Sequence, residues 1–358
     1  MNVSNSHVGN RRGRPAGLPE WNVLILTEGG QGVGFGHVTR CLSLAQAFEA
    51  RGYTVQFLIS GDESVRTLLP EETVTIADWL NDAPRLRTQV ESADIVIIDS
   101  YHAELDTYDY ISQTAPVAVY LDDTCRIDYP AGIVVNWSIS ANALPYRQKE
   151  NIFHLLGLSY LSLRKAFQDA KAKDWDDIQK NVNRVMITFG GDDSKNLTPR
   201  VLQLLMDRYP ECHYDVVIGN ACENKDAIHQ IAEKHPSGID LHHALTDDGM
   251  KALMQRVDIA ISSGGQTLAE LARMGVPTIA VIVAENQRSN VLSWEKTGFI
   301  ENAGNWDDPR FMENLSAALE RMRDYSRRCQ SLEVARQIIS GNGADRIIDF
   351  IEDRSKER

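Results

Sequence analysis

The sequence predicts an α/β fold of two Rossmann-like lobes with a cleft between them. The chain has 358 residues, and at about 100–200 residues per domain this length suits two domains. Short apolar runs alternate with stretches of helical periodicity, which predicts parallel strands joined by right-handed crossovers. This alternation begins twice, near Trp21 and again at Arg184, and each time the first strand runs into glycines.

The first lobe is expected over residues 21–165. Apolar side chains at Val38, Cys41, Leu42, Ala45 and Phe48 predict a helix from His37 to Arg51, which Gly52 ends. The expected strands are continuously apolar, which is typical of strands covered on both faces. They are residues 22–27, 53–59, 94–98, 116–121 and 133–135.

The second lobe is expected over residues 184–358, after a linker at 166–183. The charged stretch from Lys165 to Asn183 is predicted to be helical, and residues 1–20, rich in Gly, Pro and Arg, to be a flexible tail. Helices are predicted at 309–339, with a break near Arg323, and at 344–352. The strands are expected at 184–189, 213–218, 239–242, 257–261 and 278–283.

Charge and composition exclude several classes of function. Lys and Arg number 37 against 50 Asp and Glu, a net charge of −13, which argues against a nucleic-acid partner but allows a small anion at helix ends. No apolar run reaches the roughly 18 residues of a membrane span, and the first residues lack the apolar core of a signal peptide. The five cysteines are scattered and match no zinc spacing, so we expect reduced thiols, a cytoplasmic location and no metal.

The first candidate site is a glycine-rich loop between Glu28 and His37. Its glycines, Gly34 and Gly36 among them, let the backbone approach a ligand closely. His37 then starts a helix, whose positive end disfavours an imidazolium and leaves a ring able to accept a proton. The loop lacks the third glycine of a dinucleotide fingerprint, so we expect no NAD and no other cofactor.

A second candidate loop lies at the start of a helix in the second lobe. Small residues lead into it, and free backbone amides at a helix start suit a diphosphate. Glu270, one turn further on, offers a carboxylate for the two hydroxyls of a ribose. The loop residues are Ser263, Gly264, Gly265, Gln266 and Thr267.

Polar or glycine residues follow several other predicted strands, at the edge where ligands bind in such sheets. Tyr101, Asp122 and Asp123 are candidates to hold a sugar. Gly190 and Gly191 are candidates for the phosphate or the sugar, and the loop after His242 and His243, which includes Leu245, for a base. Arg40, one turn after His37, either meets phosphate or faces solvent.

Together these segments resemble the UDP-2,4-diacetamido-2,4,6-trideoxy-β-L-altropyranose hydrolases of pseudaminic acid biosynthesis, which share the glycosyltransferase-B fold. The resemblance runs from about Trp21 to about Gly298. The matching segments are Gly34–Ala45, Asp99–Tyr101, Leu121–Asp123, Gly157–Arg164, Phe189–Gly191 and Ser263–Glu270.

The resemblance implies a metal-independent hydrolase of a UDP-linked amino sugar. It implies that the second lobe holds UDP, that His37 is catalytic, that Glu270 binds the nucleotide, and that Asn286 and Gln287 contact nucleotide and sugar. The segment Asn136–Ser138 departs from the family pattern, which bears on the sugar rather than on the chemistry. A UDP-sugar glycosyltransferase and a non-catalytic UDP-sugar sensor are the alternatives, and the oligomeric state is not predicted.

Overall fold

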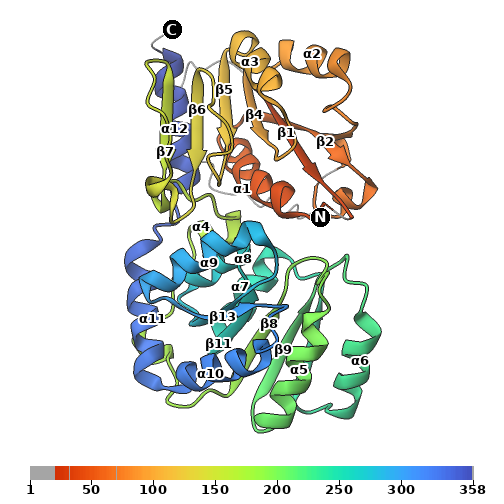
Figure 1. Ribbon diagram of the computed structural model, residues 1–358, viewed down its shortest axis with the longest axis vertical. Helices are drawn as coiled ribbons and strands as arrows, with labels where there is room; N and C mark the ends of the chain where they lie inside the picture. The colour runs from red at the N-terminus through yellow and green to blue at the C-terminus, as the bar shows by residue number, and fades with distance from the viewer. Residues whose placement is uncertain (1–20, 32, 70, 357–358) are drawn as a thin grey trace, which may run out of the picture.

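The computed structural model describes residues 21–31, 33–69 and 71–356 and confirms the predicted fold class, two parallel-sheet Rossmann-like lobes (Figure 1). The predicted tail at 1–20 lies outside the described residues. Within those ranges, no helix is long and apolar enough to cross a membrane.

The first lobe contains a seven-stranded sheet in the order β3-β2-β1-β4-β5-β6-β7, in which neighbouring strands are parallel. The strand order reverses at β1, so the loops after β1 and β4 diverge there and leave room for a ligand. The strands are β1 (Asn22–Gly29), β2 (Thr54–Gly61), β3 (Val74–Ile76), β4 (Ile95–Asp99), β5 (Val117–Leu121), β6 (Gly132–Asn136) and β7 (Ile152–Leu156). The helices of this part are α1 (Gly36–Ala50), α2 (Ala83–Glu91) and α3 (Leu105–Thr114).

The second lobe repeats this plan with a six-stranded parallel sheet in the order β10-β9-β8-β11-β12-β13. Its strands are β8 (Arg184–Thr188), β9 (His213–Ile218), β10 (Ile239–His243), β11 (Ile259–Ser263), β12 (Thr278–Ile282) and β13 (Ile300–Asn305). Its helices are α5 (Leu197–Arg208), α6 (Lys225–Lys234), α7 (Asp247–Arg256), α8 (Gln266–Met274), α9 (Glu285–Thr297), α10 (Phe311–Arg323) and α11 (Tyr325–Ile338).

Each sheet has an apolar cluster on both faces, which explains why its central strands read as continuous apolar runs. In β1, for example, Val23 and Ile25 join one cluster and Leu24 and Leu26 the other. Successive side chains of a strand point to opposite faces, so both faces must be apolar.

The last helix, α12 (Gly343–Lys356), packs on the first lobe, where Figure 1 shows it beside β7. Ile347, Ile348 and Ile351 are fully buried in the cluster that contains α1. Arg51 at the end of α1 donates to Asp345 at 2.9 Å. The second lobe was expected to extend to residue 358, but α12 packs its apolar face on the same face of the first sheet as α1.

The linker and three strands also differ from the sequence expectations. The predicted helix at 165–183 is reduced to α4 (Lys165–Gln168) and one 3-10 turn (Trp175–Asp177), because this charged stretch lacks an apolar stripe to bury. The short strand β3 and the edge strands β7, whose apolar run contains a histidine, and β13, which is polar, were not predicted. The predicted break between the helices at 309–339 is confirmed at Asp324.

Candidate functional site

A cavity of about 1230 Å³ lies between the lobes, and the carboxyl ends of strands from both sheets line it. The first lobe contributes the ends of β1, β4, β5 and β6, and the second lobe the ends of β8, β11, β12 and β13. Ligands of open parallel sheets bind at these strand ends. The volume is sufficient for a nucleotide with an attached sugar.

The glycine-rich loop delivers His37 to this cavity. Gly30 and Gly34 exchange backbone hydrogen bonds of 3.2 and 2.9 Å, which closes a tight turn before α1. Both have positive φ, 135° and 90°, a region that side chains other than glycine seldom adopt. Helix α1 starts at Gly36 without a side-chain cap, so its first amides are free of side-chain partners at the cavity wall.

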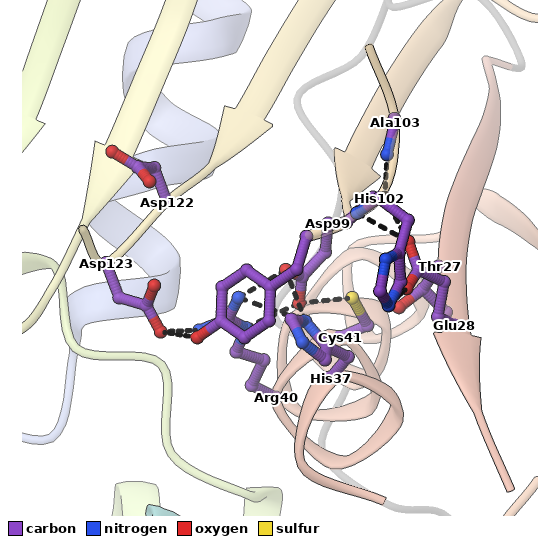
Figure 2. Close-up of polar contacts among 12 residues, drawn as sticks. Thr27, Glu28, His37, Arg40, Cys41, Asp99, His102, Ala103, Asp122 and Asp123 are labelled. Carbon is purple, nitrogen blue, oxygen red and sulfur yellow. Dashed lines mark hydrogen bonds and ion pairs between the residues drawn. The ribbon is translucent and has the colours of Figure 1, made fainter. Parts of the chain in front are cut away.

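Asp99, at the end of β4, holds the His37 ring (Figure 2). His37 Nδ1 lies 2.8 Å from Asp99 Oδ1, and the Asp99 side chain is completely buried. Burial alone would raise the pKa of Asp99, but Arg40 and His37 outweigh burial and hold the pKa well below its usual range. Asp99, as an ionised carboxylate, only accepts hydrogen bonds, whereas Arg40 Nη2, 3.1 Å from the same Nδ1, only donates. The shorter contact with Asp99 favours the tautomer that carries its proton on Nδ1 and a lone pair on Nε2.

Arg40 links this pair to a second carboxylate. Its guanidinium donates to Asp99 through Nε at 2.5 Å and also through Nη2, and to Asp123 through Nη1 at 2.9 Å. Arg40 lines the cavity, but its donors are directed at these two carboxylates. Arg40 does not simply face solvent, because its side chain is largely buried. A phosphate contact of Arg40 stays a prediction.

Tyr101 completes the first-lobe wall. Its ring meets the His37 ring edge-on, with centroids 4.4 Å apart, and its hydroxyl donates to Asp123 at 2.5 Å. The side chain of Asn286, at the start of α9, reaches this hydroxyl from the second lobe. Burial, followed by the charge of Asp123, raises the pKa of Tyr101 above its usual range, so the hydroxyl remains a donor. Asp123 Oδ1 is buried and has no hydrogen-bond partner among the residues that the structure describes.

Asp122 occupies the same loop with a different role. Its carboxylate accepts from the backbone amides of Thr124 and Cys125, at 3.2 and 2.8 Å, and from the hydroxyl of Tyr146. These bonds stabilise the turn at Cys125, which has a φ of 56°. Asp122 lines the cavity, but the loop itself uses its hydrogen-bonding capacity.

Across the cavity, the start of α8 presents backbone amides. Gly265 caps the helix without a side chain, and the first turn contains no acidic residue. Gln287 Oε1 accepts from Gly264 N at 3.1 Å, and Asn290 donates to Gly264 O at 2.9 Å, so α9 holds the α8 loop in place. The next amides, of Gly265, Gln266 and Thr267, are positioned for an anion.

The loop after β8 lies beside this helix start. Gly190 has a φ of 86°, and a Cβ on Gly191 would lie 3.6 Å from the ring of Phe35 in the first lobe. Lys195 lies 5.1 Å from the centroid of Trp306 and lines the cavity with it. The sequence analysis did not select Lys195 or Trp306, because neither belongs to a motif.

The structure brings most of the predicted site residues to this one cavity. They are Gly34, Gly36, His37, Arg40, Tyr101, Asp122, Asp123, Gly190, Gly191, Ser263, Gly264, Gly265, Gln266, Thr267, Asn286 and Gln287. Leu245 and Glu270 do not line it. Leu245 packs against the apolar cluster beneath α8, which corrects its expected place beside a base.

Glu270 is completely buried at the junction of the lobes. Both of its oxygens accept from Arg164, each at 2.6 Å, and Arg164 also donates to Asp247 at 2.5 Å. Burial lowers the pKa of Arg164, but the carboxylates of Glu270 and Asp247 outweigh it, so the pKa lies above its usual value. Arg164 thus occupies the carboxylate that was predicted to meet the ribose, and the ribose contact stays a prediction.

One group of potential metal ligands lies elsewhere, on β9 and β10. Ligand atoms of His213, Asp215 and Asp240 lie within 4.8 Å of one another, a grouping that the sequence spacing did not predict. Arg184 donates to both carboxylates, to Asp215 at 2.9 Å and to Asp240 at 3.2 Å. Its guanidinium supplies the positive charge that a cation would otherwise bring.

The chain shows distant similarity to several known proteins. Residues 184–347 match the family model of the glycosyltransferase family 28 C-terminal domain. An uncharacterized protein of Methanocaldococcus jannaschii is 28% identical over 74% of this chain and 56% of its own length. The spore coat polysaccharide biosynthesis protein SpsG of Bacillus subtilis is 24% identical over 93% of this chain and 98% of its own.

A third relative is the pseudaminic acid cytidylyltransferase and UDP-2,4-diacetamido-2,4,6-trideoxy-β-L-altropyranose hydrolase of Helicobacter pylori. It is 21% identical over 79% of this chain and 48% of its own length. The chain thus spans about half of the first and third relatives and nearly all of SpsG. Among solved structures, MurG of Acinetobacter baumannii aligns with a TM-score of 0.65 at 16% identity, over 93% of this chain and 99% of its own. This likeness shows that the two lobes form a glycosyltransferase-B fold.

Proposed function

We propose that this protein hydrolyses a UDP-linked diacetamido-trideoxy sugar to the free sugar and UDP, a step of pseudaminic-type acid biosynthesis. The observation that carries the proposal is the His37–Asp99 pair, at 2.8 Å, in a cavity whose opposite wall is the amide-rich start of α8. This arrangement supports the proposal, because a proton acceptor at His37 would face an anion bound at the start of α8. The named activity of the Helicobacter pylori relative is consistent with it.

In the proposed reaction, His37 acts as general base. Nε2 takes a proton from a water molecule as its oxygen bonds to the anomeric carbon, and the bond from that carbon to the diphosphate oxygen breaks. The electron pair leaves with UDP, and the proton passes from the ring to solvent. General base catalysis of this kind contributes about a hundred- to ten-thousandfold in rate, and Asp99 keeps the ring in the required tautomer.

Charge on the departing UDP is stabilised by the amides of Gly265, Gln266 and Thr267. A helix start concentrates partial positive charge, and no acidic side chain in the first turn of α8 cancels it. Gly190 and Gly191 lie at the same wall and present backbone to the diphosphate. Lys195 is a side-chain cation at this wall. We propose that it also stabilises the charge on the departing UDP.

The sugar is held between Tyr101 and Asp123 of the first lobe and Asn286 of the second. Asp123 Oδ1 has no partner within the described part of the chain, so it is available to accept from a sugar hydroxyl or amide. The contact between Asn286 and the Tyr101 hydroxyl spans the lobes. A sugar bound here would therefore contact both lobes. Closure of the lobes around it would place its anomeric carbon at His37.

A UDP-sugar glycosyltransferase is the second candidate, favoured by the family 28 match and the likeness to MurG. The decisive experiment incubates the protein with UDP-linked diacetamido sugars and no acceptor, and follows UDP and free sugar by mass spectrometry. Hydrolysis predicts equal amounts of both products. Release of UDP only after an acceptor is added would show a transferase, and tight binding without turnover a sensor.

A further inference from the structure

Glu28 is a buried carboxylate in the cavity wall that the proposed mechanism does not use. It is the last residue but one of β1, its side chain is 3% exposed, and it lines the cavity together with His102. Figure 2 shows Glu28 and His102 on one side of His37 and Asp123 on the other. Burying a carboxylate is costly unless its hydrogen bonds are satisfied.

Only one oxygen of Glu28 is satisfied. The Ser100 hydroxyl accepts from the amides of His102 and Ala103, at 3.0 and 2.7 Å, and donates its own proton to Glu28 Oε1. The His102 amide approaches the same oxygen at 3.4 Å. Within the described chain, no hydrogen bond to Oε2 is present, and its ion-pair partner is the imidazole of His102 at 3.5 Å.

No Lys or Arg of the described chain neutralises Glu28. Its single ion-pair partner there is His102. The His102 side chain is 68% exposed, and its Nε2 lies 3.5 Å from Oε2 of Glu28. The nearby guanidinium of Arg40 is directed at Asp99 and Asp123. A ligand in the cavity that brings a hydrogen-bond donor to Oε2 would therefore reach an acceptor to which no protein donor of the described chain is bonded.

The position of Glu28 indicates which part of a ligand it meets. Thr27 pairs with Asp99 in the sheet, and successive side chains point to opposite faces. Asp99 turns toward α1, where it holds His37, so Glu28 leaves its strand on the other face. A sugar whose anomeric carbon lies at His37 would thus meet Glu28 with a substituent away from that carbon.

We propose that Glu28, with His102 beside it, is a specificity subsite that accepts a hydrogen bond from an N–H group on the sugar ring away from the anomeric carbon. The N–H belongs either to an acylamino group or to a primary amine. The inference rests on the proposed function, because it assumes that a UDP-linked sugar fills the cavity. It extends that function by assigning the residue that selects the nitrogen substituent.

The test uses three UDP-linked 2-acetamido sugars that differ only at carbon 4, which carries an acetamido group, a primary amine or hydrogen. We expect the wild type to favour the nitrogen-bearing sugars over the deoxy sugar by about tenfold or more in kcat/KM, because a hydrogen bond to a charged acceptor is stronger than one to a neutral acceptor. E28Q should lower kcat/KM for the nitrogen-bearing sugars about tenfold and leave the deoxy sugar within about twofold. Whichever nitrogen-bearing sugar is preferred identifies the amide or the amine as the natural donor.

Glu63→Gln is the matched control, because Glu63 is 77% exposed and outside the cavity lining. E28D, which keeps the charge but withdraws it by one methylene, replaces E28Q if E28Q does not fold, and should show a smaller loss with the same pattern. An unchanged preference, or an equal loss on all three sugars, would overturn the subsite and leave hydrolysis intact. If none of the sugars releases UDP, the proposed function fails, and dissociation constants of the same compounds by calorimetry still decide the subsite.

Discussion

The Nδ1 atom of His37 lies 2.8 Å from Oδ1 of Asp99, and this contact determines which ring nitrogen faces the cavity. Asp99 also accepts from Arg40, so the carboxylate is fixed from two sides. The low pKa of Asp99 that results keeps it an acceptor. His37 therefore has one nitrogen committed to the protein and one available for chemistry, as a general base requires.

The His37→Asn variant should lose turnover while it retains nucleotide binding. Loss of a general base typically lowers the rate about a hundred- to ten-thousandfold, whereas UDP is expected to bind mainly to the second lobe. UDP release in single-turnover experiments and UDP affinity by calorimetry measure the two effects. His235→Asn is the control, because His235 does not line the cavity. Survival of turnover in His37→Asn would refute the assigned role of His37.

Asp99 should make stability depend on pH in acid. Its pKa is lower in the folded chain than in the unfolded chain, so its contribution is fully present above the unfolded pKa of about 4 and is lost as the pH falls toward the folded value. The free energy of unfolding in urea should thus fall more steeply below about pH 4 for the wild type than for Asp99→Asn. Equal slopes for the two proteins would contradict the ion pair.

The sequence predicted the features that depend on local pattern. Strands such as β12 were found because buried strands are continuously apolar, and His37 was found because the glycines of its loop are neighbours in the chain. The edge strand β7 was missed because His154 interrupts its apolar run. Asp99 appeared in the sequence only as a polar residue after a strand, since its contact with His37 spans 62 positions.

Long-range contacts also explain why the pairing of Glu270 with Arg164 was not predicted. A glutamate one turn into a glycine-started helix is well placed for a ribose, but Arg164, which holds it, lies 106 positions away in the chain. No local pattern encodes that separation. The same holds for α12, whose apolar stripe predicts a helix but not the lobe that receives it.

Removing Arg164 should destabilise the protein strongly. Arg164→Met leaves the carboxylate of Glu270 completely buried without its cation, which typically costs about 3–5 kcal/mol in free energy of unfolding. The double variant with Glu270→Leu should recover part of this loss, and a double-mutant cycle in urea measures the coupling. Arg85→Met, in an exposed pair with Asp82, should cost less than about 1 kcal/mol.

The UDP affinity of a Glu270 variant distinguishes the two roles considered for Glu270, a contact between the lobes and a contact with the ribose. If it only joins the lobes, Glu270→Gln should leave UDP affinity within about threefold, a change below 1 kcal/mol. A loss of UDP affinity of a hundredfold or more, without a loss of stability, would restore the ribose contact expected from the sequence.

Adjacent glycines before α8 should differ in their tolerance of a methyl group. A Cβ on Gly264 would lie 2.3 Å from Val291 Cγ2 in α9, whereas the nearest atom to a Cβ on Gly265 is 3.9 Å away. Gly264→Ala should therefore force α9 away from the α8 loop and cost about 1–3 kcal/mol in free energy of unfolding. Gly265→Ala should cost much less, and urea unfolding of the two variants checks the difference.

Helix α12 should be required for the stability of the first lobe, although it follows the second lobe in the chain. Ile348 is fully buried against the face of the sheet that α1 covers, and truncation of a buried isoleucine to alanine typically costs about 2–5 kcal/mol. Ile348→Ala should lower the free energy of unfolding by that amount. It should also increase hydrogen exchange in α1 more than in α10, since α12 shares its core with α1 and not with α10. Arg51→Ala, which removes only the partly exposed ion pairs to the same helix, should cost about 1 kcal/mol or less. Greater exchange in α10 than in α1 would show that α12 belongs energetically to the second lobe.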